Sequence, residues 1–135
     1  MRIAIIGAGV GGLTLALSLL DTGITDIHIY ESSSKISELG VGINVLPHAM
    51  REMKKLGLLD ELISVGVETS ELKYFTHKGQ LIWHEERGVN AGYKWPQISI
   101  HRGHLIKTLH NALEERLGAN RINTSHHLND FINID

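Results

Sequence analysis

Cysteine is missing from this sequence of 135 residues, and neither sign of charge is in large excess. A chain without cysteine has no disulfide and no thiolate metal site, and it suits a reducing cytoplasm, where we expect it to be found. The formal net charge is −2, so no basic excess points to a nucleic-acid partner. Hydrophobic residues make up 42% of the chain, which is ordinary for a globular domain with a core of its own.

Charged residues are absent from one stretch, Ile3 to Leu20, which could therefore be a membrane span or a signal peptide. Glycines lie in the middle of that stretch, where a span would need strong helix formers. No small-residue cleavage site precedes polar sequence after it. We therefore expect no membrane partner.

Glycine, by contrast, is placed in a pattern near the N-terminus. Ile3 to Ile6 is an apolar run of the length of a buried parallel strand, and Gly7, Gly9 and Gly12 follow it in the spacing G-x-G-x-x-G. Gly7 permits a tight turn, Gly9 lets a pyrophosphate approach the backbone, and Gly12 lets a helix lie close to the strand. We expect that helix from Gly11 to about Thr22, with its N-terminal N–H groups facing a diphosphate.

A second expected strand, Ile27 to Tyr30, leads to Glu31, which lies about twenty residues beyond the glycines, as in a dinucleotide-binding fingerprint. A carboxylate at this place would hydrogen-bond the hydroxyls of an adenosine ribose. Ser32 follows in a polar run whose hydroxyls could contact the adenosine side or belong to a solvated loop. The order of strand, glycine turn, helix, strand and acid predicts dinucleotide binding.

The remainder of the chain alternates between helical and strand patterns. Methionines and a leucine at helical spacing predict a buried helix face, with Met50, Met53 and Leu56 inward. A change of period around His77–Gln80 predicts an antiparallel hairpin with Gly79 in its turn. The elements expected after the second strand are a glycine cluster at Leu39–Asn44, a helix from Pro47 to Gly57 with a shorter successor, the hairpin over about 71–86, a strand at Ile98–Ile100, an amphipathic helix ending at Gly118, and a strand in the tail from about Arg121.

Three ordered blocks of the sequence resemble the FAD-dependent aromatic hydroxylases, the group A flavoprotein monooxygenases. The blocks are I-I-G-A-G-V-G-G-L with Glu31, then L-G-V-G-I-N-V-L-P with its helix ending K-K-L-G-L, then S-I-H-R-G-H-L. Within that family the pattern is similar to that of the phenazine-modifying hydroxylases, and the similarity covers nearly the whole chain. The resemblance implies an α/β, Rossmann-like FAD-binding fold, with a parallel sheet, helices and the antiparallel hairpin as an insert.

The resemblance also assigns cofactor contacts and no catalytic or metal-binding residue. It implies that the pyrophosphate of FAD faces the glycine turn, that the adenosine lies at the acid after the second strand, and that the flavin lies beside the second glycine cluster. An arginine after the Ile98–Ile100 strand matches the family arginine that reaches the cofactor. Many relatives carry arginine directly after the acid, where this chain has serine. The residues implied are Gly7, Gly9, Gly11, Gly12, Glu31, Ser32, Gly42, Ile43, Asn44 and Arg102.

In such hydroxylases NAD(P)H reduces the flavin, and a flavin hydroperoxide then transfers oxygen to an aromatic small-molecule substrate. Family members are much longer than this chain and carry later blocks for FAD and substrate. We therefore expect residues 1–135 to be the N-terminal part of the FAD-binding domain, incomplete at its C-terminus and inactive alone. The missing C-terminal half is a candidate partner. The alternatives are a non-catalytic module that binds NAD or FAD, and a gene remnant without function.

Overall fold

The computed structural model describes residues 1–35 and 40–133 and divides the chain into two compact units. One unit comprises Met1–Leu39 and Leu105–Asp135, and the other comprises Gly40–His104. Helix α4 (Arg102–Leu117) begins at the end of the second unit and continues into the first.

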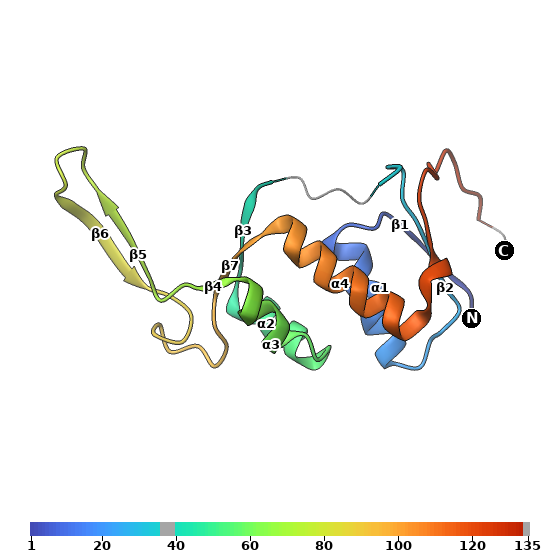
Figure 1. Ribbon diagram of the computed structural model, residues 1–135, viewed down its shortest axis with the longest axis horizontal. Coiled ribbons are helices and arrows are strands. Elements are labelled where there is room, and N and C mark those ends of the chain that lie inside the picture. The colour runs from blue at the N-terminus through green and yellow to red at the C-terminus, as the bar shows by residue number, and fades with distance from the viewer. Residues whose placement is uncertain (36–39, 134–135) are drawn as a thin grey trace. The chain divides into compact units, whose positions relative to one another are not determined.

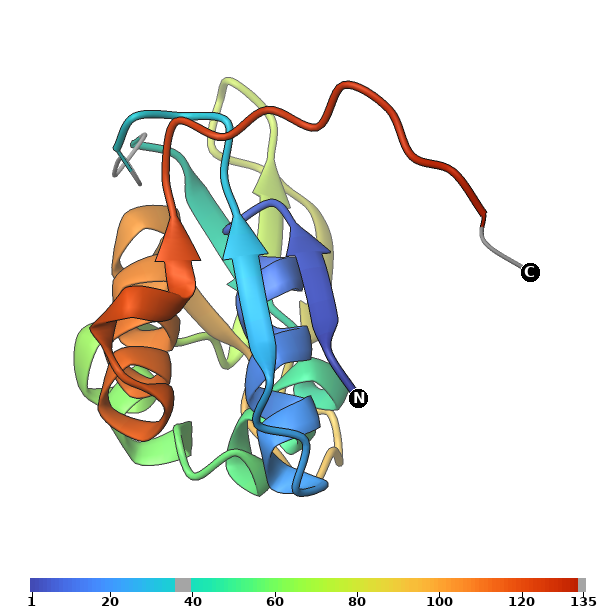
Figure 2. The ribbon, with the colours of Figure 1, turned by 90° about the vertical axis from the view of Figure 1, so that its right-hand side faces the viewer.

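The first unit contains a parallel sheet in the strand order β1-β2-β8. Strand β1 (Ile3–Ile6) pairs with β2 (Ile27–Tyr30), which pairs with the short β8 (Ile122–Asn123) after the 3₁₀ turn η1 (Ala119–Arg121). Helices α1 (Val10–Asp21) and α4 lie on the same face of this sheet (Figures 1 and 2). Parallel strands joined by a helical crossover take this arrangement because the helix covers the sheet face that the connection crosses.

Side-chain burial alternates along β1 and β2, as period-two geometry requires. Ile5, Ile27 and Ile29 are buried on the helix-covered face, whereas Ile6 is 52% exposed on the opposite face. The helices contribute leucine-rich buried faces that complete this core. Their buried residues are Leu13, Ala16 and Leu17 of α1 and Leu105, Ile106, Leu109, Ala112 and Leu113 of α4.

Two glycines allow α1 to follow β1 within a short turn. Gly7 has φ +99°, a conformation that side chains other than glycine rarely adopt. A Cβ on Gly12 would lie 2.0 Å from the carbonyl oxygen of Gly7 and 3.3 Å from Cγ2 of Ile5. The turn and the helix therefore approach each other more closely than any other residue at position 12 permits.

The second unit contains an antiparallel sheet in the order β3-β7-β4. Strand β3 (Gly42–Val45) pairs with β7 (Ile98–His101), and the two-residue β4 (Val67–Glu68) pairs with the other edge of β7. Helices α2 (Pro47–Lys55) and α3 (Leu59–Val65) lie between β3 and β4 in sequence. The buried residues of these elements and of the turn between α2 and α3 include Val45, Met50, Met53, Leu56, Leu58, Leu62, Ile98 and Ile100.

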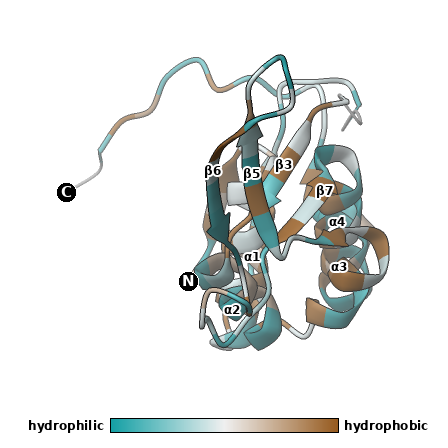
Figure 3. Cartoon of the chain, turned by 90° about the vertical axis from the view of Figure 1, so that its left-hand side faces the viewer, coloured by the Kyte–Doolittle hydropathy of each residue, from teal (hydrophilic) through white to brown (hydrophobic). Residues whose placement is uncertain are grey.

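A two-stranded hairpin extends the second unit, formed by β5 (Glu71–Phe75) and β6 (Leu81–Glu86). Gly79 has φ +78° in its turn. Hydrophobic and hydrophilic residues lie side by side along both strands (Figure 3). Tyr74 faces Trp83 across the pair, and both side chains are more than half exposed.

The structure confirms most of the elements that the sequence predicts. The parallel sheet, the crossover helix, the hairpin over 71–86 and the buried methionine face all appear. Helix α4 begins at Arg102, directly after β7. The prediction of a strand along the tail is largely wrong: only Ile122–Asn123 forms a strand, and 124–133 contains no helix or strand. Leu39 and Ile134 lie outside the described residues.

One element was not expected from the sequence. In the antiparallel sheet β3-β7-β4, the paired strands β3 and β7 lie more than 50 residues apart in sequence, with Gly42 opposite His101. Within 1–35 and 40–133, no helix combines the length and the apolar character needed to cross a bilayer.

Replacing Gly12 with alanine tests the close approach of turn and helix. The new Cβ would collide with the Gly7 carbonyl oxygen, so we expect Gly12→Ala to lower the free energy of unfolding by roughly 1–3 kcal/mol. Gly11→Ala is the matched control, because a Cβ there meets no described atom within 4 Å and alanine favours helix by up to about 1 kcal/mol. Urea unfolding followed by circular dichroism measures both, and equal effects of the two substitutions would contradict the close approach.

Candidate functional site

The first group of candidate residues lies at the carboxyl ends of β1 and β2. Gly7 donates its amide N–H to the carbonyl oxygen of Tyr30, at 2.7 Å, which joins the glycine turn to the end of β2. Gly9 is the N-cap residue of α1, with an extended backbone at φ −77° and ψ −176°. α/β folds bind ligands at the carboxyl ends of their parallel strands, where the βα turns lie.

Glu31 connects this turn to the second strand through its side chain. Its Oε2 accepts a hydrogen bond from the Ala8 amide at 2.8 Å, and its Oε1 accepts one from the Ser33 amide at 2.8 Å. The Ser32 hydroxyl donates to the same Oε1 at 3.2 Å. Each carboxylate oxygen has two acceptor positions, so these bonds leave acceptor capacity for a ligand hydroxyl.

These hydrogen bonds change the acidity of the group. The amides of Ser33 and Ala8 donate to the carboxylate and lower the pKa of Glu31 from 4.5 to about 2, against the effect of burial, which raises it. The side chain is therefore an anion throughout the physiological range and acts as a hydrogen-bond acceptor only.

The N-terminus of α1 has the features of an anion site. The helix has no side-chain cap and no acidic residue in its first turn, so its first amides face outward without a competing carboxylate. A Cβ built on Gly9 or Gly11 meets no described atom within 4 Å, so the backbone is open on that side. Amide donors that no side chain covers suit a diphosphate, and the neighbouring Glu31 carboxylate suits the hydroxyls of a ribose. Together these groups fit a diphosphate linked to a ribose.

The second group of candidates lies in the other unit, on β3 and at the start of α4. Gly42 and Ile43 pair with His101 and Ile100 of β7. The amide of Arg102 donates to the carbonyl oxygen of Val41 at 3.0 Å, so the arginine lies directly beside the glycine strand. Its side chain is exposed and carries a guanidinium that suits a phosphate.

Asn44 belongs to a polar row across the same sheet. The Ser99 hydroxyl donates to Asn44 Oδ1 at 2.6 Å, and Thr69 Oγ1 lies 2.8 Å from that hydroxyl. The row fixes the orientation of the Asn44 side chain, whose amide nitrogen stays available as a donor.

The structure thus brings the predicted residues together in two sets. Gly7, Gly9, Gly11, Gly12, Glu31 and Ser32 belong to the first unit, and Gly42, Ile43, Asn44 and Arg102 to the second. Sequence reasoning missed the amides of Ala8 and Ser33, since a backbone donor leaves no signature in residue type. It also missed the pairing of the tail with β2, because the strand that starts it has two residues.

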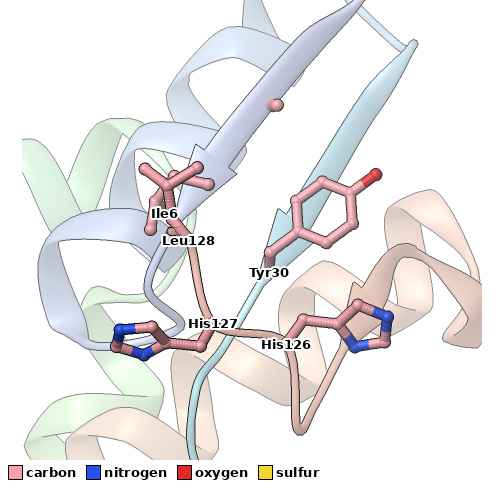
Figure 4. Close-up of a pocket in the computed structure, with 6 residues that line it drawn as sticks. Ile6, Tyr30, His126, His127 and Leu128 are labelled. Atoms are coloured by element: carbon pink, nitrogen blue, oxygen red, sulfur yellow. The ribbon is translucent and has the colours of Figure 1, made fainter. Parts of the chain in front are cut away.

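A cavity of about 270 Å³ lies beside the first set, on the sheet face opposite the helices (Figure 4). It is lined by Ala4 and Ile6 of β1, Tyr30 of β2 and the tail segment His126–Leu128. The rings of Tyr30 and His126 lie 5.8 Å apart at its edge. The tail thus passes directly over the residue that precedes Glu31.

Acid titration tests the bonds to Glu31. Because its pKa is lower in the folded state than the ordinary 4.5, the stabilisation is complete above pH 4.5 and is lost as the pH falls to about 2. We expect Glu31→Gln to cost roughly 1–2 kcal/mol at pH 7, a value reduced for the partial exposure of the carboxylate, and to flatten the dependence on pH. Glu115→Gln, at an exposed position of α4, is the control; unfolding at each pH measures both. An unchanged dependence in Glu31→Gln would contradict the assigned bonds.

The chain is similar to known flavin hydroxylases along almost its whole length. It is 46% identical over 129 residues to phenazine 1,6-dicarboxylic acid hydroxylase PhzS of Lysobacter antibioticus, covering 96% of this chain and 32% of that protein. It is 31% identical over 123 residues to salicylate hydroxylase of Pseudomonas putida, covering 85% of this chain and 27% of that one. The chain therefore spans between about a quarter and a third of the length of these two relatives.

Solved structures share the fold. The crystal structure of FqzB superposes with a TM-score of 0.79 at 23% identity, covering 99% of this chain and 31% of that one. The tetrameric form of 2-methyl-3-hydroxypyridine-5-carboxylic acid oxygenase gives a TM-score of 0.76 at 25% identity, with 92% and 31% covered. These neighbours confirm the α/β fold that the family resemblance implies. The family described as FAD binding domain matches residues 1–131, and the chain belongs to this family.

Proposed function

We propose that this chain supplies part of the FAD site of a flavin-dependent monooxygenase that hydroxylates an aromatic ring. The observation that carries the proposal is the pair of hydrogen bonds by which Glu31 connects the Ala8 amide of the glycine turn to the end of β2. This geometry places an anionic hydroxyl acceptor beside open amide donors, which is the combination that an adenosine diphosphate needs.

In the first unit, the roles follow from the chemistry of each group. The amides at Gly9, Gly11 and Gly12 bind the pyrophosphate. The backbone is open at Gly9 and Gly11, and Gly12 keeps α1 close against the glycine turn. The Glu31 carboxylate accepts from the ribose hydroxyls, and the Ser32 hydroxyl beside it supports the same end of the cofactor. Gly7 shapes the turn through its positive φ.

In the second unit, we assign the flavin side of the cofactor to Gly42, Ile43 and Asn44. Backbone without a side chain at Gly42 allows a flat ring to approach, because a Cβ there meets no described atom within 4 Å. Arg102 supplies a fixed positive charge for the phosphate-bearing cofactor.

The bound flavin would supply the redox and oxygen chemistry, with NAD(P)H as reductant. This chain's own residues bind and orient the cofactor, and none of them is assigned as a catalytic acid or base. Relatives act on phenazine dicarboxylic acid and salicylate, which favours an aromatic carboxylic acid as substrate. Since the chain spans about a third of such relatives, we expect the 135 residues to bind the cofactor without hydroxylating, and to need further polypeptide for catalysis.

A ligand titration tests the proposed cofactor. A ligand that binds only the folded chain adds about 2.7 kcal/mol at a hundred times its dissociation constant. We expect FAD to raise the melting temperature and to lose fluorescence on binding, while NAD does neither. Stabilisation by NAD but not FAD would instead support the non-catalytic dinucleotide module, and stabilisation by neither would contradict cofactor binding by this chain.

A charge substitution tests the role of Arg102. We expect Arg102→Met to weaken FAD about tenfold or more, because a hydrogen bond to a charged phosphate contributes roughly 1.5–3 kcal/mol. Riboflavin, which has no phosphate, should bind equally to both forms. Lys107→Met removes one positive charge from an exposed position of the same helix and should leave both affinities unchanged. Equal losses for FAD in the two variants would show a general charge effect and overturn the assignment.

A further inference from the structure

The segment Asn123–His126 makes hydrogen bonds to both backbone groups of Glu31, its amide and its carbonyl oxygen. The amide of Glu31 donates to the carbonyl oxygen of Asn123 at 2.8 Å, and the amide of His126 donates to the carbonyl oxygen of Glu31 at 2.9 Å. Both backbone groups of Glu31 are therefore held by one segment more than 90 residues further along the chain. Such pairing limits the motion of the residue that carries the carboxylate.

The same segment also holds a group that donates to the carboxylate. The Ser125 amide donates to the carbonyl oxygen of Ser33 at 3.0 Å, while the Ser33 amide donates to Glu31 Oε1 at 2.8 Å. Ser125 thus acts on the carboxylate through Ser33. A shift of the segment would move the donor as well as the backbone of Glu31.

Side chains fasten the segment at its two ends. Asn123 Nδ2 donates to the carbonyl oxygen of Ile29 at 3.2 Å. At the other end the His126 ring contacts the Tyr30 ring, and its Nδ1 donates to the carbonyl oxygen of Thr124 at 2.7 Å. Figure 4 shows Tyr30 and His126 side by side at the rim of the cavity.

The backbone at Ser125 makes this arrangement sensitive to substitution. Among the described residues other than glycine, Ser125 alone has a positive φ, at 58°. That conformation turns the chain so that two consecutive amides, those of Ser125 and His126, both face the segment after β2. A β-branched residue is strongly disfavoured there, whereas glycine adopts it freely.

We propose that Ser125 and the segment Asn123–His126 are positioning residues for Glu31, so that affinity for the adenosine side of the cofactor depends on them. The proposal rests on the proposed function of Glu31 in binding the ribose. In this role Ser125 does not contact the cofactor. Its left-handed backbone keeps the Ser33 and His126 amides hydrogen-bonded to Glu31, the residue that does contact the cofactor.

A double-mutant cycle with ADP as the probe tests the proposal in the full chain. We expect Ser125→Val to weaken ADP up to about tenfold, since the binding-competent conformation becomes a minor fraction of the folded chain. Ser125→Gly, which keeps the positive φ, should retain the affinity. In the Glu31→Gln background, Ser125→Val should have no further effect, because the carboxylate to be positioned is gone.

A second measurement needs no ligand and separates this proposal from the proposed function. NMR titration should find the Glu31 carboxyl pKa near 2 in the unaltered chain and in Ser125→Gly, and higher in Ser125→Val, where the Ser33 amide has moved. If Ser125→Val does not fold, Ser125→Ala makes the same test with a smaller penalty. Equal weakening of ADP in both backgrounds, or an unchanged Glu31 pKa, would overturn the positioning role. Failure of the unaltered chain to bind FAD or ADP would overturn the proposed function alone.

Discussion

The hydrogen bond from the Ala8 amide to the Glu31 carboxylate is the contact on which the first unit's site depends. It joins a glycine turn, which has backbone donors and no side chains to satisfy them, to an acid from the next strand. The bond is charge-assisted, so it is shorter and stronger than a bond between neutral groups. One side chain thereby fixes the turn and keeps a negative charge at the edge of the sheet.

The arrangement also shows why the site lies at this edge. The carboxyl ends of parallel strands meet there, and the crossover brings the N-terminus of α1 to the same place. The close approach of Gly12 to Gly7 keeps α1 against β1, so the N-terminal amides of α1 lie beside Glu31. Helices α1 and α4 cover one face of the sheet, and the tail crosses the other face beside Tyr30.

Strand pairing and a row of polar side chains hold the second unit together. Its central strand β7 is paired on both edges, and the hydroxyl of Ser99 connects Asn44 of β3 with Thr69, the residue that follows β4. The hairpin β5–β6 has no third strand among the described residues, and an isolated two-stranded ribbon is marginally stable in water. Tyr74 and Trp83 of this hairpin are both more than half exposed.

The sequence by itself determined the strand, turn and helix at the N-terminus, because glycine spacing, apolar periodicity and the acid at Glu31 are local features. It also determined the hairpin and the methionine face, since both follow from period alone. Only the tertiary structure decided which groups hold Glu31 in place. The Ala8 and Ser33 donors are backbone amides, and the Asn123–His126 segment reaches Glu31 from more than 90 residues away with a two-residue strand. A residue type records neither a backbone hydrogen bond nor a distant partner, which is why these contacts could not be predicted from the sequence.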